Sequence, residues 1–153
     1  MGEAVDAMAV LVSAALAGNE FAIAAFVHPV LTRLDDATHS KAVQPLARIT
    51  GRAMPGWYAA ALVLSAACVL FRTVGSAGWW LSLSAAVLVG GSILFTFISP
   101  LPINNRVAKW DLNNLPTGWR ADRSRWDRMH QARVAVLVVA ASLLAAAAVS
   151  GRI

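Results

Sequence analysis

Apolar residues dominate four separate stretches of the sequence, and polar residues gather between them. The stretches are Val5–Val27, Trp57–Val74, Trp79–Ile98 and Ala132–Val149. A helix needs roughly 20 residues, within a range of about 17–25, to cross the hydrocarbon core of a bilayer. Four such stretches in 153 residues leave too little polar chain to cover them in water. We therefore predict an all-α fold, a single domain over residues 1–153 that forms an up-down antiparallel transmembrane four-helix bundle.

The segments between the spans predict how the bundle is connected. Gly75–Gly78 is short enough only for a tight hairpin, and Ser40–Arg52 has the apolar spacing of a helix lying on the membrane surface. Pro100–Pro102 should end the third helix, and Asp122–Gln131 should form a polar helical approach to the fourth span. The first span follows acidic residues, unlike a secretory signal peptide, so we expect it to be retained.

Composition supports a membrane protein and excludes several other classes. The chain is 58% hydrophobic and 14% charged, whereas soluble domains carry about 25% charged residues. A single cysteine, Cys68, excludes an internal disulfide and a cysteine-cluster metal site. The net charge is +5, but the basic residues are confined to two loops instead of forming a nucleic-acid-binding face.

Those basic residues predict the orientation. The loop Pro29–Gly56 carries four Lys or Arg and the loop Ser99–Gln131 carries six, while the amino terminus carries none. By the positive-inside rule, both long loops are cytoplasmic and both termini are outside. We expect a multi-pass protein integral to the plasma membrane.

Several polar residues remain that orientation does not explain. Glu20 lies inside the first span, where an ionisable group costs on the order of 2.5–3.5 kcal/mol. His28 lies eight residues later, near the same stripe of that helix and just before Pro29. Glu20 also suits a structural hydrogen bond inside the bundle, and a lone histidine at a helix end is commonly a capping or interfacial residue.

The fourth span supplies partners for these residues. Trp126, His130 and Arg133 follow an i, i+4, i+7 spacing and share one helix face. Arg133 could extend outward to the interface or pair with Glu20. Asn104 and Asn105, after the third span, are predicted at the same end of the bundle. This convergence favours a catalytic or ligand-binding cavity over a scaffold.

The combination of motifs resembles the anthrone oxygenase family of small four-span membrane proteins. The resemblance covers nearly the whole chain and is carried by short motifs, which are Asn19-Glu20-Phe21, His28-Pro29, Met54-Pro55, Pro102-Ile103-Asn104-Asn105 and the series Trp119, Arg123, Trp126, His130, Arg133.

This resemblance implies that dioxygen oxidises an aromatic polyketide anthrone to the quinone. A base would remove a proton from the CH2 group between the aromatic rings, and O2 would capture the carbanion. The catalytic candidates are His28, His130, Glu20 and Arg133, with either histidine as the base. Arg133, Asn104 or Asn105 would stabilise the oxyanion, and the substrate-binding candidates are Asn104, Asn105, Trp126 and Trp119.

Other interpretations stay open at this point. The reaction needs either no cofactor beyond dioxygen, or copper, iron or haem held by His28 and His130, with Glu20 as a further metal ligand. In a second class of function, Glu20 and Arg133 form a relay in a small transporter or accessory subunit. A third is a structural interaction protein, which leaves Glu20 unexplained. We also predict a homo-oligomer, because four short helices enclose little volume for a tricyclic substrate.

Overall fold

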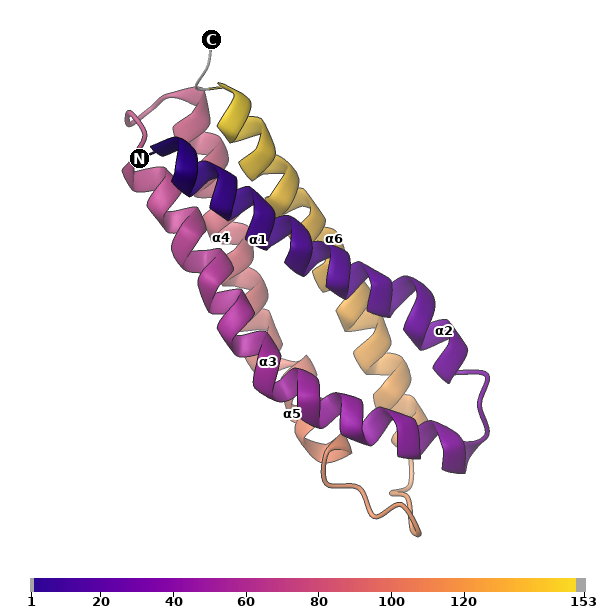
Figure 1. Cartoon of the computed structure of the whole chain (residues 1–153). Helices are drawn as coiled ribbons and strands as arrows, with labels where there is room; N and C mark the ends of the chain where they lie inside the picture. Colours follow the sequence, from indigo (N-terminus) through magenta and orange to yellow (C-terminus); the bar gives the residue numbers. More distant parts are fainter. Residues whose placement is uncertain (1, 151–153) are drawn as a thin grey trace.

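The computed structural model describes residues 2–150, which are mostly helical (Figure 1). In chain order the elements are α1 (Gly2–Ala22), the π-helix η1 (Ile23–Val27), α2 (His28–Leu31), α3 (Asp36–Leu70), α4 (Ala77–Ile98), α5 (Pro100–Val107) and α6 (Trp119–Ser150). Within the described residues, four continuous helical segments are long and apolar enough to cross a membrane. These are Gly2–Leu31, Asp36–Leu70, Ala77–Ile98 and Trp119–Ser150. The predicted all-α four-span fold is confirmed.

The first span contains a wider turn just before Pro29. Proline lacks a backbone N–H, and its ring clashes with the carbonyl four residues earlier, so a regular α-helix cannot continue through it unchanged. Here the backbone N–H of His28 donates to the carbonyl oxygen of Ile23, five residues back. A π-helix turns through fewer degrees per residue than an α-helix. The turn η1 therefore brings Glu20 and His28 closer to one face of the first span than a regular α-helix would.

The third element is longer than the sequence predicted. The segment Ser40–Arg52 is helical, as expected, but it is continuous with the second span in the single helix α3. Asp35 caps this helix by accepting hydrogen bonds from the Ala37 and Thr38 amides, and hydrogen bonding from Thr38 lowers the pKa of Asp35. Pro45 and Pro55 lie inside α3, and the helix changes direction along its length (Figure 1).

The remaining connections follow the local chemistry. Gly75 has φ of 82°, a conformation that favours glycine, and the Ser76 hydroxyl accepts a hydrogen bond from the Trp79 amide to cap α4. The predicted hairpin is therefore confirmed. The Pro-Leu-Pro sequence does end α4, but it also begins a short helix, α5, that the sequence analysis did not predict. Proline suits the first turn of a helix, where its missing N–H leaves no hydrogen bond unmade.

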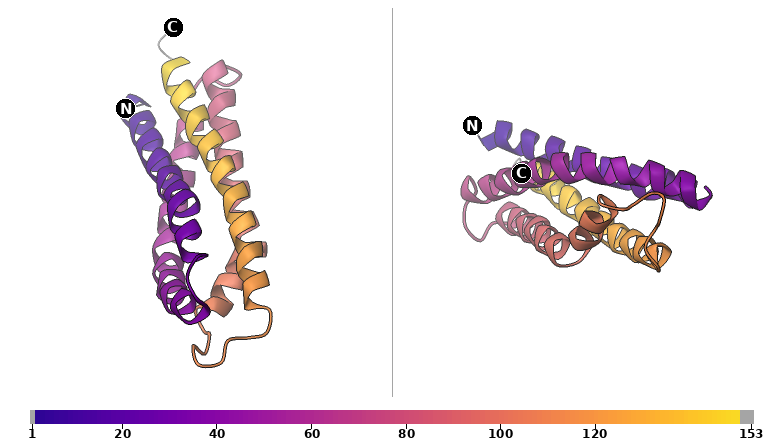
Figure 2. Two further views of the ribbon diagram at one scale, coloured as in Figure 1. Left: turned by 90° about the vertical axis from the view of Figure 1, so that its right-hand side faces the viewer. Right: turned by 90° about the horizontal axis from the view of Figure 1, so that it is seen from below.

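The four long segments pack as a ring in which sequence neighbours are spatial neighbours (Figure 2). α1 packs on α3 and α6, and α4 packs on α3 and α6, which is the up-down antiparallel arrangement. Buried apolar residues form two clusters. The upper cluster, on the side of the two chain ends in Figure 1, is centred on Leu16, Ala61, Ala85, Val89 and Leu137. The lower cluster is centred on Val43, Ala47, Ile103, Val107 and Trp110.

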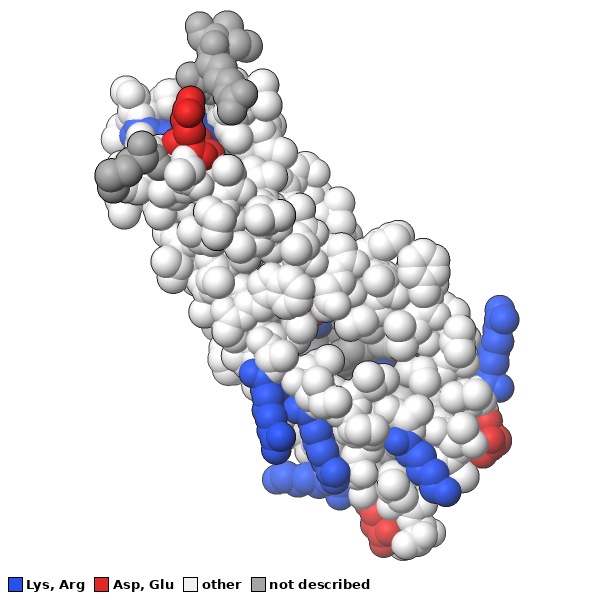
Figure 3. Space-filling view, viewed as in Figure 1, with Lys and Arg blue, Asp and Glu red and all other residues white. Residues whose placement is uncertain are grey.

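The lower cluster is tied together by polar contacts to backbone atoms. Gln44 Nε2 donates to the Trp110 carbonyl oxygen at 2.8 Å, and Asn104 Nδ2 donates to the Ala47 carbonyl oxygen at 3.1 Å. These contacts hold α5 and the loop after it against α3. Most Lys and Arg side chains visible in Figure 3 surround this end of the molecule, as the distribution of basic residues in the sequence predicts.

Candidate functional site

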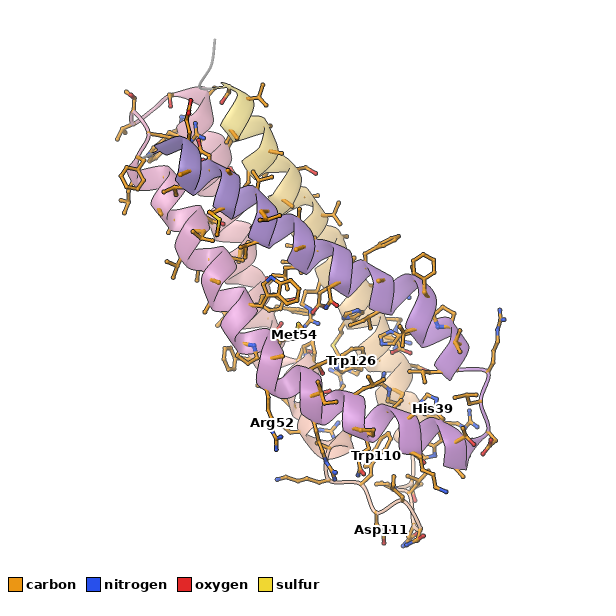
Figure 4. The ribbon with its side chains drawn as sticks, viewed as in Figure 1. His39, Arg52, Met54, Trp110, Asp111 and Trp126 are labelled. Carbon is orange, nitrogen blue, oxygen red and sulfur yellow. The ribbon has the colours of Figure 1, made fainter. Side chains whose placement is uncertain are left out.

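A cavity of about 510 Å³ lies between the two apolar clusters. This volume falls within the range of about 300–1,000 Å³ that is typical of small-molecule sites. Its α3 wall is mostly apolar and includes Leu46, Met54 and Leu62, whereas α1, α2 and α6 supply the charged and imidazole groups. Met54 and Trp126 lie in the interior of the bundle, and Arg52 points away from it (Figure 4). The cavity is partly open to the surface, and whether a second subunit completes it stays a prediction.

Glu20, His130 and Arg133 form a hydrogen-bonded cluster on one wall of the cavity. Arg133 Nη2 donates to Glu20 Oε2 at 2.7 Å. His130 Nε2 is 3.1 Å from the Glu20 carbonyl oxygen, which can only accept, so Nε2 carries a hydrogen. His130 Nδ1 lies 3.0 Å from Arg133 Nη2 and 3.2 Å from Glu20 Oε2. Both nitrogens of His130 are therefore engaged within the cluster.

The pairing of Glu20 with Arg133 explains how two charges persist inside an apolar bundle. Glu20 is 2% exposed and Arg133 is 8% exposed. Arg133 Nη1 also donates to the Thr96 hydroxyl at 3.1 Å, which ties α6 to α4. Its guanidinium carbon lies 5.6 Å from the centre of the Tyr58 ring on α3. The cluster thus connects all four long segments of the bundle.

His28 belongs to a second polar group beside the first. Its Nδ1 is 3.4 Å from Asp127 Oδ1, and Arg123 Nη2 donates to the same Asp127 oxygen at 3.1 Å. Its side chain makes no hydrogen bond to any described residue. A carboxylate beside Nδ1 favours the tautomer that carries hydrogen on that nitrogen, which leaves the lone pair on Nε2. His28 thus differs from His130, both of whose ring nitrogens are engaged within the cluster.

Trp126 joins the two groups. Its ring stacks on His130 at 4.8 Å between centroids with an interplanar angle of 11°, and it meets the His28 ring edge-on at 5.0 Å. The Arg123 guanidinium carbon lies 4.6 Å from the Trp126 ring centre. The His28 and His130 rings are 5.1 Å apart. The predicted shared face of Trp126, His130 and Arg133 on α6 is borne out, because all three line the cavity.

The other predicted binding residues lie in three different places. Asn104 lines the cavity from α5, with its Nδ2 on the Ala47 carbonyl. Asn105 is exposed and is not part of the lining. The consecutive positions lie about 100° apart on α5, so only one can face inward. Trp119 packs instead in the lower cluster, 5.7 Å from Trp110 and 5.2 Å from His39.

The donor set does not fit a metal at His28, His130 and Glu20. Among residues 2–150, no group of three or more His, Cys, Asp or Glu side chains is arranged to hold a metal ion. Glu20 and His130 Nδ1 instead face the Arg133 guanidinium, whose positive charge opposes a bound cation. The same contacts leave His130 without a free nitrogen to ligate haem iron.

Sequence reasoning missed Asp127 and Tyr58 as site residues. Asp127 lies among the arginines that set orientation, and its signal was its spacing, i+4 from Arg123 and three residues before His130. Tyr58, the only tyrosine, is buried with its hydroxyl unpartnered among the described residues.

If Glu20 and Arg133 formed a relay in a small transporter, polar groups would have to continue through both halves of the bundle. Beyond Glu20 and Arg133, the upper cluster fills the interior with apolar and small side chains. The ion pair Arg72–Asp6 lies at the far end. Among residues 2–150, the buried polar side chains between the cluster and that pair include the serines Ser13, Ser65 and Ser82, and no charged side chain is buried there.

Comparison with known proteins adds one finding. A protein-family model described as anthrone oxygenase matches residues 6–143, which confirms the resemblance seen in the sequence motifs. The name of that family indicates an oxygenase-type oxidoreductase. No curated protein and no solved structure matches the chain.

Proposed function

We propose that this chain, which belongs to the anthrone oxygenase family, is a membrane-bound oxygenase of aromatic polyketide biosynthesis that converts an anthrone to its quinone with dioxygen. The observation that carries this proposal is the cavity of about 510 Å³, largely apolar but with two imidazoles, the Arg123 guanidinium and the buried Glu20–Arg133 ion pair on its walls. An apolar cavity suits both a flat aromatic molecule and O2. The polar wall supplies a base and a source of electrostatic stabilisation.

The reaction balances without a cofactor. A base removes one proton from the CH2 group, and the electron pair of the broken C–H bond is delocalised onto the anthrone oxygen. O2 then forms a C–O bond at the same carbon, and return of the proton gives a hydroperoxide. Loss of water from this hydroperoxide leaves the second carbonyl. One anthrone and one O2 therefore give one quinone and one water.

We assign separate tasks to the two polar groups. His28 Nε2 is the proton acceptor, because Asp127 lies beside Nδ1 and both nitrogens of His130 are engaged. The Glu20 carboxylate and Asp127, 3.4 Å from Nδ1, oppose the cost that burial and the Arg123 charge impose on a positive charge at His28. Arg133, held by Glu20 and His130, stabilises the negative charge that develops on the anthrone oxygen.

The setting is a membrane in which substrate and O2 both concentrate. Four apolar segments suit insertion in a bilayer. The positive-inside rule supports a cytoplasmic location for the two long loops, and with them for the polar end of the cavity. A lipophilic substrate would reach the cavity from that leaflet.

The test uses the full chain in lipid nanodiscs with anthrone, after subtraction of the oxidation seen in protein-free nanodiscs. We expect one O2 consumed for each quinone formed. His28→Ala should lower kcat by roughly 100-fold or more, the usual contribution of a general base. Arg128→Gln, at an exposed position on α6, is the matched control and should retain full activity. No acceleration by the wild-type protein, or full activity of His28→Ala, would overturn the proposal. Elemental analysis of the active protein checks for a bound metal.

A further inference from the structure

Two hydrogen bonds tie the first span to α3, and they lie far apart. Trp57 Nε1 donates to the Val12 carbonyl oxygen at 3.2 Å, and His39 Nδ1 donates to the Leu31 carbonyl oxygen at 2.8 Å. His39 and Trp57 are 18 residues apart, which corresponds to about 27 Å of helix. Among residues 2–150, no other hydrogen bond and no ion pair joins the segment Gly2–Leu31 to α3. The seam between the two ties is therefore held by side-chain packing alone.

Both edges of this seam line the cavity. On α3 the edge consists of Leu46, Thr50 and Met54, which are spaced four residues apart and so lie along one side of the helix. On the first span the edge consists of Ile23 and Val27, both in η1. None of the five is buried, and Leu46 is 41% and Val27 36% exposed. Side chains that line a cavity and also reach the surface mark its opening.

The surface around this opening is apolar. Four of the five edge residues are aliphatic or Met, and Phe26, Val30 and Ile49 beside them are 66%, 59% and 64% exposed without lining the cavity. Figure 3 shows a hollow between α1 and the lower half of α3, with Lys or Arg atoms visible inside it. The basic residues of the lining are Arg123 and Arg133. A contiguous apolar surface of this kind suits contact with lipid acyl chains better than contact with water.

The loop end of the bundle, which would give access from water, is closed. The lower cluster fills it with buried apolar side chains. Gln44 and Arg48 donate to backbone carbonyl oxygens after α5, and Asn104 on α5 donates to a backbone carbonyl oxygen of α3. Arg52, in the same part of α3, points away from the interior (Figure 4). Polar ties thus secure α3 on its α5 side and leave the side that faces η1 free to separate.

We propose that the seam between η1 and residues 46–54 of α3 is a lateral portal through which an uncharged lipophilic molecule passes from the bilayer into the cavity. Val27 is the last residue of the predicted first span, so the portal opens to the cytoplasmic leaflet. Pro45 and Pro55 interrupt the hydrogen bonding of α3 on either side of this edge, which allows the helix to bend there. This inference rests on the proposed function for the need to admit a lipophilic substrate, and it adds the route.

The test measures how fast reagents of different polarity reach a thiol inside the cavity. Ala47→Cys in a Cys68→Ala background supplies the thiol, because Ala47 lines the cavity and is 5% exposed. The full chain in lipid nanodiscs is reacted with neutral N-phenylmaleimide or with a maleimide that carries a permanent charge. Asp111→Cys, in the loop before α6, corrects for the intrinsic reactivity of each reagent. We expect the neutral reagent to label the cavity thiol at least about tenfold faster after this correction, because an apolar passage disfavours a charge.

Bulky residues on the edges of the seam should close the portal. Val27→Trp narrows it from the first span and Leu46→Trp narrows it from α3. We expect either to slow neutral labelling of the cavity thiol by about tenfold or more, because an overfilled seam separates less often. Val30→Trp, at an exposed position outside the lining, is the matched control and should label at the parent rate. Leu46→Ala adds no bulk and should speed labelling, which tests the portal with the opposite sign.

Three results would overturn the inference. Equal corrected rates for the two reagents would place the entrance in contact with water. Equal rates in Val27→Trp, Leu46→Trp and Val30→Trp would place the entrance at another seam, such as the one between α3 and α4. No labelling of the cavity thiol by either reagent would show that the cavity is closed in the membrane.

These outcomes are separable from those of the proposed function, because labelling does not require oxidation of anthrone. Labelling in the expected pattern without anthrone turnover would keep the portal and refute the oxygenase. Anthrone turnover with labelling rates that ignore Val27→Trp and Leu46→Trp would do the opposite.

Discussion

At the scale of single residues, the buried pair Glu20–Arg133 is the feature on which the site depends. A lone charge inside a bundle that spans a membrane is costly, and removing one member of a buried pair leaves the other uncompensated. The 2.7 Å contact, with His130 and Thr96 as further partners, satisfies most of the hydrogen-bonding groups of both side chains. The pair therefore both holds the helices together and fixes a positive charge at the cavity.

Glu20→Gln should lower the free energy of unfolding by about 3–5 kcal/mol, because it leaves Arg133 buried without a counter-charge. The double variant Glu20→Gln/Arg133→Met should recover most of that loss. Denaturant titration in detergent micelles measures both. Glu3→Gln, at an exposed position on the same helix, is the control and should change stability by no more than about 0.5 kcal/mol. A double variant as unstable as the single one would contradict this account.

Candidate site residues inside apolar stretches could be identified from the sequence, whereas those in the charged segments near loops could not. Glu20 stood out because a bilayer penalises it, and Arg133 stood out because it lies past the start of the fourth span. Asp127 and Arg123 gave no such signal, since a charged segment beside a span is expected for orientation alone. Their burial depends on how far α6 extends below the span and on the lower cluster that covers it, which are tertiary properties.

At the scale of elements, the π-helix η1 determines where His28 points. The wider turn ends at the residue before His28, and the following Pro29 prevents a regular helix there. Such turns are frequent at functional sites. Here the turn allows Glu20 and His28, from one helical segment, to line the same cavity.

Pro29→Ala should let a regular α-helix form through this segment and rotate His28 away from the cavity. We expect kcat to fall about tenfold or more while thermal stability is retained or raised, because the substitution restores a backbone hydrogen bond. The measurement is anthrone turnover together with a thermal melt. Pro45→Ala in α3, at an exposed position outside the cavity lining, is the control for removing a helix-interior proline. Normal turnover by Pro29→Ala would show that η1 does not position His28.

Periodicity predicted the existence of the helices better than their connections. The predicted surface helix and the second span proved to be one helix, α3, because proline at Pro45 and Pro55 bends a helix without ending it. The same property hid α5, since the prolines that stop α4 also suit the first turn of a new helix. Both departures shape the cavity, because α3 and α5 supply part of its lining.

At the scale of the whole molecule, the two apolar clusters and the cavity between them divide the bundle into unlike halves. The upper half is a packed apolar core, and the lower half has the long polar connections and aromatic packing. Ten of the 13 basic residues fall in the loops Pro29–Gly56 and Ser99–Gln131, which connect the helices at the lower end. This asymmetry favours one orientation in a membrane.

That orientation can be measured with single cysteines in a Cys68→Ala background. A cysteine at Ser76, in the turn before α4, should react with a membrane-impermeant maleimide in intact cells, because this turn is predicted to lie outside. A cysteine at Asp111, in the loop before α6 (Figure 4), should react only after the cells are made permeable. Cys68 is 2% exposed in the native chain, and the Cys68→Ala parent, which has no cysteine, defines the background labelling. The reverse pattern would place the polar end of the cavity on the outer side and overturn the proposed cytoplasmic access for the substrate.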